Sequence, residues 1–171
     1  MNTEKFKVLG VMSGTSLDGI DCAVVEFTKN NNVWSFDFIS GKTTAYSKDW
    51  QHKLQHAIHL SDTDLHLLNI EYTYFLAEFL ADFITDNKLT DLDFISSHGH
   101  TVLHQPENGI TLQIGNLPTV TDMISLSFVC DFRVQDVQLG GQGAPLVPIG
   151  DRLLFADYDY CLNLGGFSNI S

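Results

Sequence analysis

The stretch KVLGVMSGTSLDGIDCAVVEF, residues 7–27, decides the fold of this chain. Residues 7–12 are apolar, residues 13–19 are polar and glycine-rich, and residues 21–27 are again apolar and β-branched. Apolar segments on both sides of a glycine-containing turn are typical of two β-strands joined by a hairpin. Residues 33–40 follow an asparagine-rich turn and continue the pattern, so we expect an antiparallel meander of three strands.

Two helices are predicted after the meander. The first covers about residues 50–60, and Ser61 is the predicted N-cap of a longer helix that ends near residue 87. Apolar side chains recur along the longer helix at steps of three and four residues, which is typical of a face packed into a core. This apolar stripe consists of Leu65, Leu68, Tyr72, Phe75, Leu76, Phe79 and Phe83.

Short strands and short helices alternate in the rest of the chain. The predicted strands cover residues 93–97, 111–114, 128–132 and 160–164, and the predicted helices cover residues 117–124 and 149–155. A meander followed by such alternation indicates an α/β fold with a sheet of mixed direction covered by helices.

The charge of the chain excludes some partners. Its 171 residues carry a formal net charge of −12, with only nine Lys plus Arg, so nucleic acids and anionic membranes are repelled. A nucleotide is compatible with this charge, because Mg²⁺ and backbone N–H groups neutralise phosphates without a basic surface.

Cysteines and the amino-terminal segment indicate the compartment. Cys22, Cys130 and Cys161 are odd in number and lie among apolar residues, as expected of reduced thiols. Residues 1–7 have no apolar signal segment, and no stretch approaches the ~18 apolar residues that a membrane span needs. We therefore expect a cytoplasmic protein.

The turn of the first hairpin is a candidate phosphate-binding loop. Residues 13–21 hold two glycines, three hydroxyls and the carboxylates of Asp18 and Asp21. Glycines let a backbone approach a phosphate, hydroxyl and N–H groups donate to it, and a carboxylate can hold Mg²⁺. The alternative is an ordinary polar hairpin. A Walker A loop is excluded, because no Lys follows the second glycine and no helix begins there.

Arg133 is the centre of a second candidate site. It directly follows the predicted strand 128–132, which contains Asp131, and it precedes Asp136 and the small-residue loop 140–145. Open α/β sheets bind ligands at the carboxyl ends of strands, and a guanidinium suits a carboxylate or the vicinal oxygens of a sugar. The alternative is an internal ion pair between Arg133 and Asp131 or Asp136.

Three histidines form a third group. His98, His100 and His104 have a spacing seen in metal sites, which leaves a metal-dependent hydrolase as an alternative function. No cysteine or carboxylate lies close in sequence to complete such a site, so we favour hydrogen-bonding roles, with His98 as a candidate substrate contact.

Five motifs together, in this order, resemble those of anhydro-N-acetylmuramic acid kinases, and the resemblance covers nearly the whole chain. They are residues 10–21 (GVMSGTSLDGID), 97–99 (SHG), 131–133 (DFR) with Asp136, 140–148 (GGQGAPLVP) and 163–170 (NLGGFSNI). The resemblance implies an actin-like ATPase, or ribonuclease H-like, α/β domain with a mixed five-stranded sheet and flanking helices. Residues 1–158 would form the first domain, and residues 159–171 the first strand and start of the phosphate hairpin of a second.

The resemblance also implies site residues. It gives the sugar-binding role to His98, Arg133 and Asp136, and Mg²⁺ binding to Asp18 or Asp21. His100 departs from the family, where Gln is usual. The implied ATP contacts are Ser13, Gly14, Thr15, Ser16, Leu17, Asp18, Gly19, Ile20, Asp21, Gly165, Gly166 and Asn169.

The reaction implied by the resemblance is phosphoryl transfer from ATP, with Mg²⁺, to the 6-oxygen of 1,6-anhydro-N-acetylmuramic acid. Water opens the anhydro ring, and the product is N-acetylmuramic acid 6-phosphate, an intermediate of cell wall recycling. The family's water-activating aspartate follows the segment that matches Ser171, so we expect this chain alone to be inactive. The alternative is a non-catalytic nucleotide- or sugar-binding module, with a homodimer formed through an unpaired strand at residues 160–164.

Overall fold

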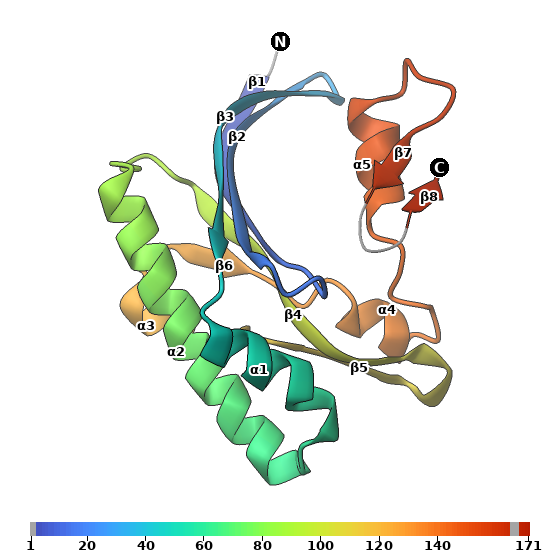
Figure 1. Cartoon of the computed structure of the whole chain (residues 1–171). Coiled ribbons are helices and arrows are strands. Elements are labelled where there is room, and N and C mark those ends of the chain that lie inside the picture. Colours follow the sequence, from blue (N-terminus) through green and yellow to red (C-terminus); the bar gives the residue numbers. More distant parts are fainter. Residues whose placement is uncertain (1–2, 165–167) are drawn as a thin grey trace.

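The computed structural model describes residues 3–164 and 168–171. Within these residues a six-stranded sheet has the order β3-β2-β1-β4-β5, with β6 also paired to β4, and β7 and β8 form a separate pair (Figure 1). The strands are β1 Thr3–Ser13, β2 Gly19–Asn30, β3 Val33–Ala45, β4 Phe94–Gln105, β5 Ile110–Ile114, β6 Ser127–Val129, β7 Leu162–Leu164 and β8 Ser168–Ile170. The helices are α1 Lys48–His56, α2 Asp62–Asp86, α3 Val120–Met123, α4 Val134–Gln138 and α5 Val147–Leu154, with short 3₁₀ turns at Ala57–His59 and Pro106–Asn108.

The predicted meander is confirmed. β1 pairs antiparallel with β2, and the last pair is Ser13 with Ile20, so residues 14–19 connect the two paired strands of the hairpin. β2 in turn pairs antiparallel with β3. Gly19 is required at the start of β2, because a Cβ atom there would lie 2.2 Å from the carbonyl oxygen of Thr44 on β3. The sequence pattern and the steric fit therefore lead to the same hairpin.

β4 connects the meander to the rest of the sheet. It runs parallel to β1, and its other edge pairs with β6 over its first residues and with β5 over its second half. The prediction of five strands is therefore wrong by one. β4 is twelve residues long, seven more than predicted, and this length gives both β5 and β6 a partner.

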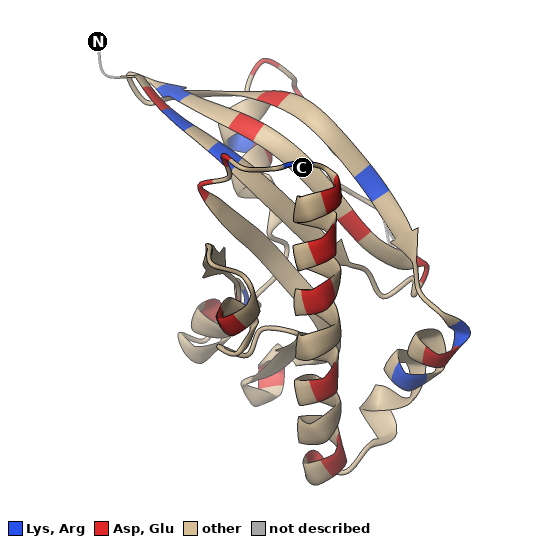
Figure 2. Ribbon diagram, turned by 90° about the vertical axis from the view of Figure 1, so that its left-hand side faces the viewer, with Lys and Arg blue, Asp and Glu red and all other residues tan. Residues whose placement is uncertain are grey.

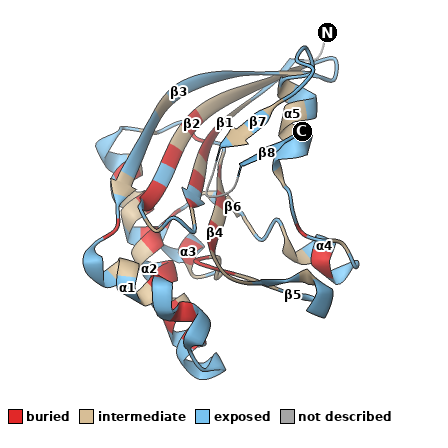
Figure 3. Ribbon diagram, turned by 45° about the vertical axis from the view of Figure 1, so that its right-hand side comes forward, coloured by how far each residue is buried: buried red, intermediate tan, exposed pale blue. Residues whose placement is uncertain are grey.

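The core lies between the sheet and α2. Ser61 caps α2 as predicted, since its hydroxyl accepts a hydrogen bond of 3.2 Å from the N–H of Asp64. The apolar stripe of α2 faces the sheet, with Phe75 and Phe79 partly buried and its other five members buried, as the burial colouring of Figure 3 shows for the helix. Periodicity alone thus identified the core face of this helix.

α4, α5 and the β7–β8 pair lie on the opposite side of the sheet from α2 (Figure 1). The strand predicted over residues 128–132 ends at Val129, because Asp131 adopts a left-handed conformation with φ of 58°. β7 pairs with β8, so the expectation that residues 160–164 form an unpaired strand is wrong for Leu162–Leu164. Self-association and a domain boundary near residue 159 stay predictions.

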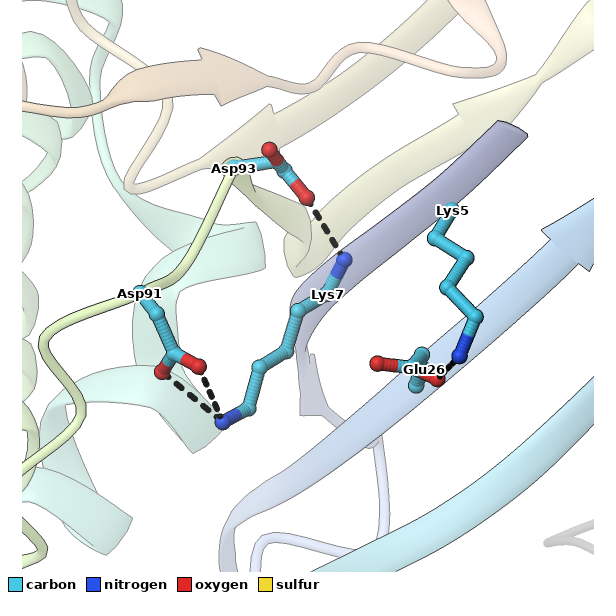
Figure 4. Close-up of polar contacts among 5 residues, drawn as sticks. All are labelled: Lys5, Lys7, Glu26, Asp91 and Asp93. Atoms are coloured by element: carbon cyan, nitrogen blue, oxygen red, sulfur yellow. Dashed lines mark hydrogen bonds and ion pairs between the residues drawn. The ribbon is translucent and has the colours of Figure 1, made fainter. Parts of the chain in front are cut away.

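Acidic residues dominate the surface, as Figure 2 shows along α2, and basic residues are scattered. Lys7 joins β1 to the segment before β4: its Nζ lies 2.8 Å from Asp91, and its backbone N–H donates to Asp93 over 2.7 Å (Figure 4). Lys5 pairs with Glu26 of β2 in the same region. These contacts fix the amino-terminal end of β1, far along the strand from the predicted phosphate loop.

No helix in the described part of the chain combines the length and apolar character needed to cross a bilayer.

Candidate functional site

A cleft of about 770 Å³ gathers several of the predicted site residues on the sheet face opposite α2. Its wall includes Gly10 and Met12 of β1, Asp21 of β2, His98 of β4, Arg133 before α4 and Asn169 of β8. A smaller cavity of about 460 Å³ beside α5 is lined by apolar residues only, and it offers no group for phosphate or sugar chemistry. The polar cleft is therefore the candidate site.

The first hairpin presents its two carboxylates differently. Asp21 lines the cleft and accepts a hydrogen bond from the Thr43 hydroxyl on β3. Asp18 is exposed in the turn and accepts a hydrogen bond of 2.7 Å from the Ser16 hydroxyl, which is the main reason that the pKa of Asp18 is lowered. Leu17 reaches the left-handed region, with φ of 60°, to close the turn. Of the two predicted Mg²⁺ carboxylates, only Asp21 lines the cleft.

Arg133 is held at the cleft by two hydrogen bonds. Its Nε donates to His98 Nε2 over 3.0 Å, and its Nη1 donates to the carbonyl oxygen of Gly143 over 2.6 Å. The ion pair with Asp131 or Asp136 is absent from the described part of the chain. Because a guanidinium has five N–H groups, three remain for a ligand.

His98 is neutral at this position. Burial lowers its pKa, and the adjacent charge of Arg133 lowers it further. Since Nε2 accepts from Arg133, Nδ1 carries the proton and donates to the carbonyl oxygen of Gly99 over 2.9 Å. Both ring nitrogens are therefore occupied, and the histidine orients the guanidinium.

Asp136 shapes the glycine-rich loop instead of lining the cleft. Its carboxylate accepts a hydrogen bond of 2.6 Å from the N–H of Gly143. A Cβ atom on Gly141 would lie 2.3 Å from the same carboxylate, so a larger residue there would displace the carboxylate from Gly143. Through Gly143, Asp136 fixes the carbonyl oxygen that receives Arg133.

Ser13 and His100 lie on the opposite face of β1 and β4 from the cleft. Both are buried, and the Ser13 hydroxyl lies 3.0 Å from His100 Nδ1 and 2.6 Å from the Tyr46 hydroxyl. Tyr46 in turn lies 2.5 Å from the hydroxyl of Tyr72 on α2. The structure therefore separates Ser13 from Asp21, although both belong to the predicted phosphate loop.

The histidines do not form a metal site in the described residues, which contain no group of three His, Cys, Asp or Glu side chains suited to a metal ion. His98 contacts Arg133, His100 contacts Ser13, and His104 lies 3.2 Å from the Thr111 hydroxyl. A magnesium ion in a kinase needs fewer protein ligands, because it usually keeps several waters and binds one or two carboxylates together with phosphate oxygens. Asp21 fits that requirement.

The sequence as a whole was compared with known proteins. The family model described as anhydro-N-acetylmuramic acid kinase matches residues 6–171. The chain belongs to this family. Its mixed sheet with flanking helices is accordingly the actin-like ATPase fold of the anhydro-N-acetylmuramic acid kinases.

Curated anhydro-N-acetylmuramic acid kinases are similar over nearly the whole chain. The kinase of Bradyrhizobium diazoefficiens is 37% identical over 95% of this chain and 48% of its own length. Those of Colwellia psychrerythraea and Bacillus cereus are 35% and 34% identical, over 43% and 46% of their own lengths. The chain thus spans about half the length of the curated relatives that it matches.

Sequence patterns did not single out several residues that line the cleft or bond to Ser13. Phe132 and Asn163 line the cleft within the quoted motifs, but their residue types gave no separate signal. Tyr46 lies outside every motif, and Tyr72 was predicted only as core. Gly165 and Gly166 lie outside the described residues.

Proposed function

We propose that this chain forms the nucleotide- and sugar-binding lobe of an ATP-dependent kinase for 1,6-anhydro-N-acetylmuramic acid. The observation that carries the proposal is that Asp21 of the hairpin and the Arg133–His98 pair line one cleft. Asp21 suits a nucleotide with bound Mg²⁺, and the guanidinium of Arg133 suits an anionic sugar. The relatives are named anhydro-N-acetylmuramic acid kinases, and this name suggests the sugar substrate.

The proposed reaction transfers the γ-phosphoryl group of ATP to the 6-oxygen of the sugar. Water adds to the anomeric carbon as the bond from that carbon to the 6-oxygen breaks, and a general base takes the proton of the water. The products are ADP and N-acetylmuramic acid 6-phosphate. Positioning and charge stabilisation are the main tasks of a protein in such a transfer.

The residues of the described chain have separate tasks in this proposal. Backbone N–H groups of residues 14–19 contact the phosphates, and Asp21 holds Mg²⁺, which neutralises charge on the transferred group. Three N–H groups of Arg133 bind the carboxylate of the muramic acid side chain. His98 keeps the guanidinium in place, because its neutral ring accepts from Arg133 Nε over 3.0 Å.

Turnover requires a further carboxylate in this proposal. Among the described residues that line the cleft, Asp21 is the only carboxylate, and it is assigned to Mg²⁺. We therefore assign the water-activating base to the part of the longer relatives that this chain does not span. The chain alone then binds ligands without turnover, in the cytoplasm, where ATP is available.

Titration calorimetry tests the proposal with two ligands measured separately, Mg-ATP and 1,6-anhydro-N-acetylmuramic acid. Binding of both, with Asp21→Asn weakening only the nucleotide and Arg133→Gln weakening only the sugar, supports it. Binding of neither contradicts it. Steady product formation by the chain alone contradicts the assignment of the base to another part of the family sequence.

A further inference from the structure

Four buried side chains form a line of hydrogen bonds behind the first hairpin. The line runs from the hydroxyl of Tyr72 on α2 to that of Tyr46, 2.5 Å away, then 2.6 Å to the Ser13 hydroxyl and 3.0 Å to His100 Nδ1. It joins α2, the segment before α1, the end of β1 and the middle of β4. None of these contacts has a part in the cleft.

All four groups are buried and uncharged near neutral pH. Tyr72 has no exposed surface, and Ser13, Tyr46 and His100 are 4%, 6% and 3% exposed. Burial raises the pKa of both tyrosines and lowers the pKa of His100 to about 4. Near neutral pH the line therefore contains three hydroxyl protons and one neutral imidazole.

The contacts at the Tyr72 end of the line favour one direction for every bond. The Tyr72 hydroxyl has one hydrogen-bond partner in the line, the Tyr46 hydroxyl, so Tyr72 donates its proton to Tyr46. The Tyr46 proton must then go to Ser13, and the Ser13 proton to His100 Nδ1. The reverse direction leaves the proton of Tyr72, which has no exposed surface, without an acceptor, whereas the assigned direction places the N–H of the 3% exposed His100 outside the line. His100 consequently carries its own proton on Nε2.

The faces of β1 support the same conclusion. Side chains alternate between the two faces of a strand, and Gly10 and Met12 line the cleft. Leu9 and Val11 are buried in the core, although Val11 also borders the cleft, and Ser13 continues that buried series. Its hydroxyl therefore points into the helix layer and not toward a ligand in the cleft.

We propose that Ser13 is a positioning residue, whose hydroxyl proton is donated to His100 Nδ1 and does not contact phosphate. The line of hydrogen bonds fixes the end of β1, from which the N–H groups of residues 14–19 and the hydroxyl of Thr15 reach the phosphates. The phosphate part of this inference rests on the proposed function; the direction of the line does not.

Nitrogen-15 NMR of the histidine rings tests the direction without any ligand. We expect His100 as the neutral Nε2–H form, with Nδ1 unprotonated. Ser13→Ala removes the donor to Nδ1, so the Nδ1–H form should become populated. Tyr72→Phe leaves the Tyr46 proton with Ser13 as its acceptor, so the direction should persist. Tyr74→Phe, an exposed position on the same helix, is the matched control and should change nothing. A protonated Nδ1 in the unaltered chain overturns the inference.

A double-mutant cycle with Mg-ATP tests the positioning role. We expect Ser13→Ala and Tyr46→Phe each to weaken binding about five-fold, the factor of one neutral hydrogen bond, and the double variant to be little weaker than either. If Ser13 donates to phosphate directly, Tyr46→Phe leaves the affinity almost unchanged and only Ser13→Ala lowers it. That result overturns the positioning role.

The two experiments separate this inference from the proposed function. If the unaltered chain binds no Mg-ATP, the proposed function is contradicted, and the His100 tautomer still decides whether Ser13 donates to His100. If Mg-ATP binds and His100 is protonated on Nδ1, the proposed function stands and the positioning role of Ser13 is wrong.

Discussion

Replacing His100 with Gln should make the chain less sensitive to mild acid. Burial lowers the pKa of His100 from 6.5 to about 4, and the neighbouring His98 adds to the effect. The amide oxygen of Gln can accept the Ser13 proton, so the hydrogen bond behind the hairpin is retained. His100→Gln then differs from the unaltered chain chiefly because Gln, unlike His, does not bind a proton at this position.

The sign and size follow from proton linkage. The unfolded chain binds a proton at His100 below pH 6.5, whereas the folded chain does not until about pH 4. The stability associated with neutral His100 is therefore complete above pH 6.5 and is lost as the pH falls toward 4. At about pH 5 the loss is about 2 kcal/mol of unfolding free energy.

Urea unfolding followed by tryptophan fluorescence, at about pH 7.5 and about pH 5, measures this difference. The fall in unfolding free energy between the two conditions should be about 2 kcal/mol smaller in His100→Gln than in the unaltered chain. His104→Gln, at an exposed position of the same strand, is the control and should behave like the unaltered chain. An equal fall in the unaltered chain and in His100→Gln would refute the reasoning.

Three further substitutions have distinct expected results. Arg133→Gln should weaken sugar binding about thirty-fold, the equivalent of a charge-assisted hydrogen bond of about 2 kcal/mol, while Arg133→Lys should recover part of the loss in calorimetry. Asp21→Asn should remove the Mg²⁺ dependence of ATP binding, measured as equal affinities with and without the ion, and unchanged dependence would exclude Asp21 as a ligand. Gly19→Ala should destabilise the chain by roughly 1–3 kcal/mol in thermal unfolding, because its Cβ would lie 2.2 Å from the Thr44 carbonyl oxygen. Gly10→Ala, whose Cβ would meet no atom closer than 3.6 Å, should be tolerated.

The fold was largely predictable because its signals are local. The meander follows from apolar runs around a glycine-rich turn, and α2 follows from Ser61 and the apolar stripe. The strand count was wrong because pairing is not local. The polar run of residues 97–101 made the middle of β4 look like a loop. Gly99 does adopt a φ of 69°, yet pairing of β4 with β1 and β5 on both sides of it continues the strand.

The candidate site was predictable in its residue types and less so in its grouping. An ion pair of Arg133 with Asp131 or Asp136 was the alternative to a ligand-binding role, but Arg133 meets the neutral ring of His98 and a backbone oxygen. The reason is that Asp136 already receives the N–H of Gly143. Spacing along the chain does not reveal which of several nearby acceptors a guanidinium reaches.

By itself, the sequence determined the family, the meander, the capped helix and the residues with chemistry, because each depends on residue type and on neighbours along the chain. Only the tertiary structure decided which face each residue occupies. Asp21 and Ser13 lie in one hairpin, yet Asp21 lines the cleft and Ser13 joins His100 and two tyrosines in the core. That separation results from the alternation of a pleated strand between two different layers, a cleft on one side and α2 on the other.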